Sequence, residues 1–395
     1  MVEASKSTSR GRTALFLLAP LAVLAAVIAL FIWTRGAGLN VVPAVPIETM
    51  QVGRTILRPG EIEVHLRNTS PQAVNISQVS INDAFWPYTL TPGGEIPRLG
   101  SAVLKLRYVW VQSEAYEIGI FTSNSIPFSV SIPVATVTPK ASGATLWKFT
   151  LIGIYVGIIP VLLGMFWLPA LRRLGSRAML FLMAATVGLL IYLGVDATSE
   201  ALELGGELQG AFQGTGLVVI GMVGTWLLLQ AVSIRQKSVG GSAAGQRMTL
   251  ATVIAVGIGL HNLGEGLAIG AAYAIGAAAL GTFLVVGFIL QNITEGLGII
   301  VPIAKDKPSL RSLAILGVIG GGPAIVGAWI GGLVYSQSLS VLFLAIGAGA
   351  VFQVAYEIGR NLVWGTKASG EMPVTVFAGV AAGMLVLYVT GMAIK

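Results

Sequence analysis

The chain has 395 residues, of which 55% are hydrophobic and only 10% charged, and its mean hydropathy is +0.83. This composition excludes an ordinary soluble globular protein and predicts an integral membrane protein. The formal net charge of +7 does not indicate nucleic-acid binding, because most basic residues lie in short connections between apolar segments, where they set membrane topology. The sequence contains no cysteine, so a metal could bind only through histidine, carboxylate or amide groups.

Nine apolar segments reach about 20 residues, the length that crosses a bilayer. They cover residues 13–33, 147–170, 178–195, 214–234, 249–274, 278–304, 312–334, 339–359 and 373–394. The first follows Lys6, Arg10 and Arg12 and is longer than the apolar core of about 7–15 residues in a cleaved signal peptide. We therefore expect a cytoplasmic N-terminus over residues 1–12 and an uncleaved membrane anchor over 13–34.

Residues 35–145 have a different composition. Short stretches rich in Val, Ile, Thr and aromatic residues alternate with Pro, Gly and Asn turns, which predicts about seven strands and an immunoglobulin-like β-sandwich. His65 lies in one of these strands, and with no further ligands nearby we expect it to be structural or solvent-facing. Asn68 and Asn75 each begin a glycosylation pattern, Asn-x-Ser.

The charges of the connections predict the orientation of the chain. The basic residues of the connections are Arg172, Arg173, Arg177, Arg235, Lys237, Arg247, Lys305, Lys307, Arg311, Arg360 and Lys367. The alternate connections contain no Lys or Arg, and they cover residues 196–213, 275–281 and 335–338. Because cytoplasmic loops carry the excess of Lys and Arg, we expect a multi-pass cell-membrane protein with an external β-domain and eight further helices over 146–395 that begin and end outside.

One of the connections without basic residues is acidic. It contains Asp196, Glu200, Glu203 and Glu207, which we expect in a single external loop. Four carboxylates there could gather cations through their local field. The alternative is a solvated acidic loop without a specific role.

The most informative feature is a motif that occurs twice. His-Asn-Leu-Gly-Glu-Gly-Leu-Ala-Ile at 261–269 returns thirty residues later as Gln-Asn-Ile-Thr-Glu-Gly-Leu-Gly-Ile at 291–299, and both copies lie inside apolar segments. A carboxylate near the middle of a membrane helix costs about 2.5–3.5 kcal/mol, so two of them predict a functional site.

The spacing within each copy places the polar side chains on one helix face. His261 and Glu265 are four residues apart, and so are Gln291 and Glu295, while an asparagine precedes each glutamate by three residues, at 262 and 292. Two such helices packed together would present one imidazole, two carboxylates and three amides to one point, a site suited to a divalent cation. The alternative is that these groups are interhelical hydrogen-bonding contacts, but two buried carboxylates without a cation would repel each other.

The paired motifs resemble the fourth and fifth transmembrane helices of the Zrt/Irt-like (ZIP) divalent-metal transporters, and the eight-helix arrangement with external termini is similar to that family. The resemblance covers about residues 145–395 and leaves out the anchor and the β-domain. It implies that His261, Glu265 and Glu295 are the principal ligands of the transported metal, that Gln291 completes this site, and that two further residues line a neighbouring position, Asn262 and Asn292.

The chain also departs from the ZIP pattern. Many members have His at position 291 and Pro at 294, and a glutamate in the sixth helix, where this chain reads Gly-Gly-Pro-Ala-Ile-Val-Gly-Ala at 321–328. We therefore expect one main metal site. The connection 235–248 lacks the histidines of many relatives, which argues against cytosolic metal sensing there. Glu357, near the cytoplasmic end of the seventh helix, either pairs with Arg360 or acts as a metal exit relay.

These features predict a mainly α membrane protein that moves a divalent cation into the cytoplasm by alternating access, with zinc expected and iron or manganese as alternatives. The cation would be the substrate, and neither a cofactor nor an enzymatic activity is expected. The first alternative is a metal-binding receptor or sensor without transport activity. An intramembrane metallohydrolase is disfavoured, because no additional general base is evident. The expected partners are the bilayer and the cation, and a homodimer and an external partner of the β-domain are left open.

Overall fold

The structure is a computed structural model that describes residues 10–34, 47–206, 208, 213–238, 242–274, 278–334, 336–369 and 373–392. The predicted tail before residue 10, residues 35–46 of the predicted β-domain, the acidic residue Glu207 and part of the connection 275–281 lie outside the described residues. The chain divides into two compact units, Met1–Ile47 and Glu48–Lys395, which we describe separately.

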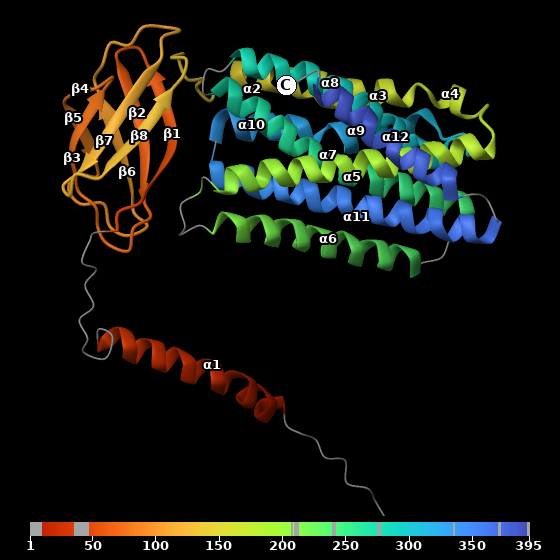
Figure 1. The fold of residues 1–395 in the computed structure, drawn as a ribbon, viewed down its shortest axis with the longest axis horizontal. Helices are drawn as coiled ribbons and strands as arrows, with labels where there is room; N and C mark the ends of the chain where they lie inside the picture. Colours follow the sequence, from red (N-terminus) through yellow and green to blue (C-terminus); the bar gives the residue numbers. More distant parts are fainter. Residues whose placement is uncertain are drawn as a thin grey trace, which may run out of the picture. The chain divides into compact units, whose positions relative to one another are not determined.

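The first unit contains helix α1, Arg10–Trp33 (Figure 1). Its apolar side chains are exposed on all sides, with Leu21, Leu24 and Phe31 each more than half exposed. A helix that is apolar all round requires an apolar environment. The described apolar stretch, Leu18–Phe31, is shorter than a full span, so the anchor stays a prediction.

The second unit begins with two antiparallel sheets (Figure 1). One sheet has the strand order β1-β2-β6-β5 and the other β4-β3-β7-β8. The strands are β1 (Met50–Arg58), β2 (Glu61–Asn68), β3 (Ile76–Ile81), β4 (Ala84–Phe85), β5 (Tyr88–Thr91), β6 (Ser101–Leu106), β7 (Tyr116–Thr122) and β8 (Pro127–Ile132). The described residues thus form eight strands where the sequence predicts about seven, and β4, with two residues, is too short to show a periodic pattern.

Alternation of side chains explains why the two sheets pack on each other. In β6, Ala102, Leu104 and Leu106 are buried while the residues between them are not. The same alternation in β7 buries Ile118 and Ile120, and side chains of both sheets belong to one apolar cluster. The region is therefore a β-sandwich with its own core.

We expect Leu104→Ala to destabilise this sandwich by about 2–5 kcal/mol, because the side chain is fully buried and its loss leaves a cavity. The measurement is the urea dependence of proteolytic cleavage within residues 48–135 of the full chain. Val103→Ala is the matched control, since the neighbouring side chain is only partly buried and should change the midpoint little. Equal midpoints for the two variants would contradict the packing described.

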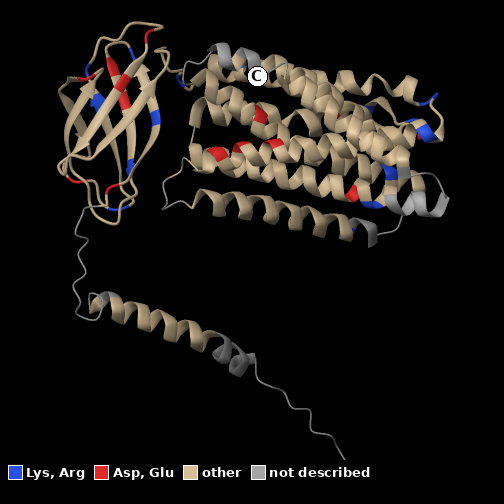
Figure 2. Ribbon diagram, in the orientation of Figure 1, with Lys and Arg blue, Asp and Glu red and all other residues tan. Residues whose placement is uncertain are grey.

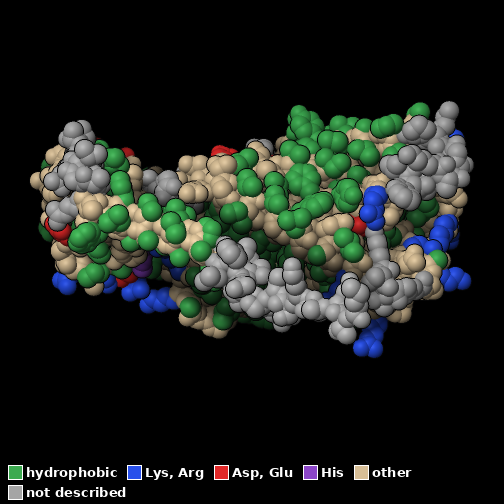
Figure 3. All heavy atoms as spheres, turned by 90° about the horizontal axis from the view of Figure 1, so that it is seen from below, with side chains coloured by type: hydrophobic (Ala, Val, Ile, Leu, Met, Phe, Trp, Pro, Cys, Tyr) green, Lys and Arg blue, Asp and Glu red, His purple; other side chains and the backbone are tan. Residues whose placement is uncertain are grey.

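The rest of the second unit is helical. Within the described residues, eight helical segments are long and apolar enough to cross a membrane. They are Gly143–Leu171, Ser176–Gly206, Gly214–Arg235, Ala243–Ala274, Leu284–Ile303, Leu310–Val334, Gln337–Leu362 and Val374–Met392. Large apolar side chains cover much of the outer surface of these helices, as Figure 3 shows for one face, and Ile220 and Phe377 are 72% and 71% exposed. The chain is thus consistent with a multi-pass membrane protein.

Four of the helices in this unit are continuous over long ranges. They are α5 (Ser176–Gly206), α6 (Gly214–Ser238), α7 (Ala243–Ala274) and α11 (Gln337–Ser369). The shorter helices α8 (Ala278–Ile300) and α12 (Pro373–Met392) are also unbroken, and the 3₁₀ turn η3 (Val301–Ile303) follows α8.

Two predicted spans are interrupted. The first is built from α2 (Gly143–Gly153), the π-helical turn η1 (Ile154–Ile158), α3 (Ile159–Met165) and α4 (Leu168–Leu171). The other is divided into α9 (Leu310–Gly321) and α10 (Pro323–Val334). Prolines explain both interruptions, because Pro160 and Pro323 lack the N–H that would continue the helical hydrogen bonds.

The predicted acidic loop at 196–213 is wrong over its first part. Helix α5 continues to Gly206, so Asp196, Glu200 and Glu203 are helical and lie on one face, four and three residues apart. The helix extends because its other face stays small and apolar, with Ala197 and Ala201 buried. A helix can thus run beyond its most hydrophobic stretch, which the apolar segment 178–195 alone did not indicate.

Candidate functional site

The two copies of the motif lie on neighbouring helices, the first on α7 and the second on α8. His261 and Glu265 on α7 and Glu295 on α8 each offer a ligand atom, and these three atoms all lie within 4.8 Å of one another. All three residues are buried, with exposures of 7%, 4% and 4%. The fold therefore brings together one imidazole nitrogen and two carboxylate oxygens among apolar helices.

Gln291 lies at the same cluster, and its amide nitrogen contacts all three of these groups. Nε2 donates to Glu265 Oε1 at 2.7 Å and lies 3.5 Å from Glu295 Oε1. It also lies 3.4 Å from His261 Nε2, which is itself 3.3 Å from Glu265 Oε1. The four side chains thus form one connected polar group.

The two asparagines of the motif are fully buried and each contacts the backbone of an interrupted span. Asn262 Nδ2 donates to Gly320 O at 3.0 Å, in the last turn of α9. Asn292 Nδ2 donates to Val156 O at 3.0 Å, in the π-helical turn, and to Glu265 Oε2 at 3.0 Å. The asparagines therefore use carbonyl oxygens that the interruptions leave without a helical partner.

Pro160 explains why Val156 O is free to accept from Asn292. In an unbroken helix the N–H of residue 160 would donate to Val156 O, and proline has no N–H. The sequence contains this signal, since Pro160 and Pro323 each lie within a span. The two backbone acceptors were nevertheless absent from the sequence prediction, because nothing in the sequence shows which side chain reaches them.

Glycines that follow the motif glutamates allow very close helix packing. A Cβ on Gly266 would lie 2.1 Å from Ala324 O of α10, and a Cβ on Gly296 would lie 2.0 Å from Val161 O of α3. The two copies of the motif therefore pack in the same way, each against the helix that follows an interruption. This packing holds Glu265 and Glu295 in their positions on facing helices.

Several polar atoms of the site are buried without a hydrogen-bond partner in the structure. They are His261 Nδ1, Asn262 Oδ1, Asn292 Oδ1 and Glu295 Oε2. Three of them are oxygen acceptors, and the part of the chain that the structure describes places no Lys or Arg in an ion pair with Glu265 or Glu295. The cluster thus has excess negative and acceptor character, which a cation would satisfy.

Glu357 on α11 is buried away from this cluster, with 2% exposure. It accepts a hydrogen bond from Ser233 Oγ of α6 at 3.3 Å, while the guanidinium of Arg360 lies 6.0 Å from the centre of the Tyr356 ring. These contacts place Glu357 in a polar contact between α6 and α11. The structure does not bring it into the cluster of candidate ligands.

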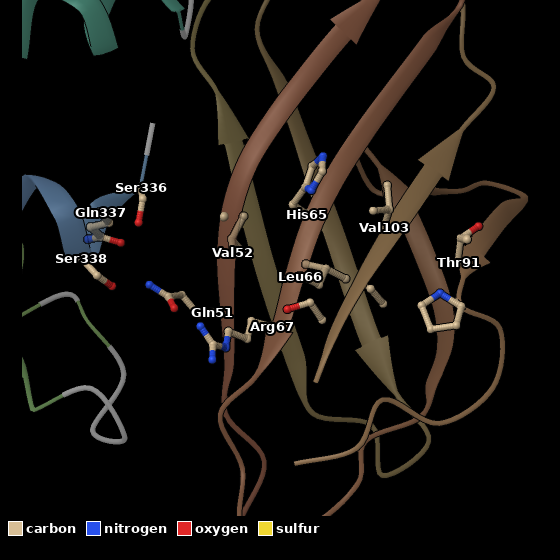
Figure 4. Close-up of a pocket in the computed structure, with 14 residues that line it drawn as sticks. Gln51, Val52, His65, Leu66, Arg67, Thr91, Val103, Ser336, Gln337 and Ser338 are labelled. Atoms are coloured by element: carbon tan, nitrogen blue, oxygen red, sulfur yellow. The ribbon is translucent and has the colours of Figure 1, made fainter. Parts of the chain in front are cut away.

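The β-domain contains the other histidine of the chain, His65. His65 lines a hollow with Gln51 and Arg67 of the same sheet and with Ser336–Ser338 (Figure 4). The lining residues include no Asp or Glu. A metal site there would lack the carboxylates that accompany a single histidine in an oxygen-rich site.

The two glycosylation patterns are not equivalent in the structure. Asn68 is fully buried, and its Nδ2 donates to Gln72 O and Ile96 O, both at 2.7 Å. Asn75 is exposed. A glycan at Asn68 would require these buried contacts to break, whereas the amide of Asn75 is accessible.

A scan against protein-family models finds none that matches this chain, and a search of curated proteins finds no matching sequence.

Proposed function

We propose that the chain is a ZIP-like transporter that moves a divalent metal cation, with zinc as the expected substrate, across the membrane through the site on α7 and α8. The observation that carries this proposal is the approach of His261, Glu265 and Glu295 to within 4.8 Å of one another inside apolar helices. Buried ionisable groups in membrane helices mark ion pathways.

The chemistry of the donor set fits the proposed substrate. Zn²⁺ binds imidazole nitrogen and carboxylate oxygen at about 2.0–2.2 Å and prefers four ligands, so the three residues would need to contract around the ion and accept a fourth. Gln291, whose side-chain amide contacts all three of these residues, is the candidate for the fourth ligand. The same donors also bind Fe²⁺ or Mn²⁺, so the donor set alone does not select zinc.

The distribution of charge supports the proposed orientation in the membrane, whereas the proposed direction of transport, from outside to cytoplasm, rests on the resemblance to the ZIP family. In the helical part of the chain, Lys and Arg gather mainly at the end where α4 and α5 meet, as Figure 2 shows. Because Lys and Arg mark cytoplasmic ends, this end faces the cytoplasm in our proposal, and the β-domain and C-terminus lie outside.

The acidic face of α5 fits a role as the external approach to the site. Asp196 and Glu200 are exposed on this helix and lie close enough to His261 to interact with it electrostatically. A row of carboxylates that leads to a buried cation site would raise the local cation concentration. We include this face of α5 in the proposed pathway.

The β-domain is proposed to be immunoglobulin-like. Its strand orders β1-β2-β6-β5 and β4-β3-β7-β8 correspond to A-B-E-D and C′-C-F-G in such sandwiches. This architecture does not itself indicate a ligand. The domain is the feature that favours the receptor or sensor alternative, which the following experiment separates from transport.

The test is time-resolved uptake of Zn²⁺ into proteoliposomes, with Fe²⁺, Mn²⁺ and Cd²⁺ for comparison. We expect saturable uptake by the wild type and loss to the background rate in the double variant His261→Ala, Glu295→Ala, because two of the three ligands are removed. The matched control is His65→Ala, Glu61→Ala, which removes the same residue types from the β-domain and should leave uptake unchanged. Binding by the wild type without uptake would favour the sensor, and equal uptake by all three proteins would refute the site.

A further inference from the structure

The side-chain amide of Gln291 points its NH₂ end toward the candidate ligands, whereas an amide that binds a metal uses its carbonyl oxygen. Nε2 is within 3.5 Å of Glu265 Oε1, Glu295 Oε1 and His261 Nε2. Ionised carboxylate oxygens accept hydrogen bonds and do not donate, which is why the NH₂ end of the amide faces them. A cation requires the other end of the amide, its carbonyl oxygen.

The NH₂ group and a bound cation cannot share this space. The three candidate ligand atoms lie within 4.8 Å of one another, and an ion bound to them at about 2.0–2.2 Å would lie between them. The N–H hydrogens of Gln291 already point into that space. They carry partial positive charge and would repel the ion.

We propose that Gln291 is a two-state amide, an inference that rests on the proposed transport function. With the site empty, Nε2 donates to the carboxylates of Glu265 and Glu295. When a divalent cation binds, the amide turns by half a rotation and Oε1 becomes a ligand. A carboxamide suits this role because its donor and acceptor ends occupy equivalent positions.

The contacts of the two neighbouring amides explain why Gln291 is the one that turns. Gln291 Nε2 contacts Glu265, Glu295 and His261, which are all candidate ligands, so a cation would take over these partners. The amide of Asn292 also donates to Val156 O, a backbone atom that remains in place when a cation binds. Asn292 is therefore held in one orientation.

The NH₂ group of Gln291 also has a role in the cation-free transporter. An alternating-access carrier must return without its cation, and during this step two carboxylates remain in the membrane. Since an unpaired buried carboxylate is costly, the NH₂ group of Gln291 would stabilise the empty site in the position that the cation leaves. Gln291 would then act in the return step as well as in cation binding.

The experiment compares two modes of flux at saturating Zn²⁺ in proteoliposomes with the full chain. Net uptake into empty vesicles requires return of the empty carrier, whereas exchange of labelled for unlabelled Zn²⁺ does not. For Gln291→Ala we expect net uptake to fall about tenfold, since a hydrogen bond to buried carboxylates is lost, while exchange stays within about twofold of the wild type. Gln230→Ala removes a comparable amide from α6 and should change neither mode.

Parallel loss of both fluxes would show that Gln291 is a ligand only, and unchanged fluxes would show that it has neither role; either result overturns the inference while the transport proposal stands. Absence of flux in both modes in the wild type would instead contradict the transport proposal itself. Gln291→Met keeps the side-chain length without a donor and should show the same split between the modes. Equilibrium Zn²⁺ binding and size-exclusion chromatography of each variant identify any that fail to fold.

Discussion

Glu265→Ala is expected to abolish Zn²⁺ uptake and to weaken Zn²⁺ binding by at least about 100-fold. Changes to partners of metal ligands already cost 10–100-fold in affinity, and Glu265 is proposed to be a ligand itself. Its two oxygens connect the site, because Oε1 accepts from Gln291 and Oε2 accepts from Asn292. The substitution therefore removes a carboxylate and takes one acceptor each from the amides of Gln291 and Asn292. Equilibrium dialysis of purified protein and proteoliposome uptake measure the two effects.

The matched control for Glu265→Ala is Glu357→Ala, which removes another buried carboxylate from an apolar helix outside the cluster of candidate ligands. Its Zn²⁺ affinity should stay within a few-fold of the wild type. Glu265→Gln keeps the size of the side chain, so loss of binding in this variant assigns the effect to charge and ligation. Intact uptake by Glu265→Ala would refute the transport mechanism proposed here.

Gly266→Leu is expected to prevent assembly of the site. A single Cβ at this position would already lie 2.1 Å from Ala324 O, and backbone atoms of α10 cannot move aside as a flexible side chain would. Overpacking typically costs about 1–3 kcal/mol, and a leucine between two helix backbones belongs at or above the upper end of this range. We expect a lower thermal stability in detergent and loss of Zn²⁺ binding, measured by size-exclusion chromatography after heating and by equilibrium dialysis. Gly296→Leu should behave in the same way.

A glycine with open space around it provides the control for the packing prediction. No atom lies within 4 Å of a Cβ placed on Gly224 in α6, so Gly224→Leu should leave both stability and binding near the wild-type values. If Gly266→Leu and Gly224→Leu were equally stable, the close approach of α7 to α10 would be wrong. If Gly266→Leu were unstable but still bound Zn²⁺ normally, the packing would be unconnected to the site.

The helical part of the fold was largely predictable because hydrophobicity over about 20 residues is a strong local signal. The predicted spans beginning at residues 214, 249 and 339 correspond to α6, α7 and α11. The prediction was wrong at the acidic extension of α5, and it did not include the interruptions within the two confirmed spans Gly143–Leu171 and Leu310–Val334. There, small buried residues and prolines determine the backbone.

The candidate ligands were also predictable, because residues four apart share a helix face whatever the rest of the fold. Sequence alone could not show that Asn262 and Asn292 contact Gly320 O and Val156 O. These contacts join residues 58 and 136 positions apart. The sequence therefore predicted the two motif asparagines as lining groups, but it did not predict the backbone carbonyl groups to which they donate.

The amino-acid sequence by itself determined that the chain has segments long and apolar enough to cross a membrane and that two helices each carry a set of polar side chains on one face, because hydrophobicity and helical periodicity are local properties. Only the tertiary structure decided which atoms meet. The approach of α7 to α8, the packing of Gly266 and Gly296 on neighbouring backbones, and the NH₂ group of Gln291 among three candidate ligands all depend on how separate helices pack. Packing is set by the shapes of all the helices together, and no single segment contains that information.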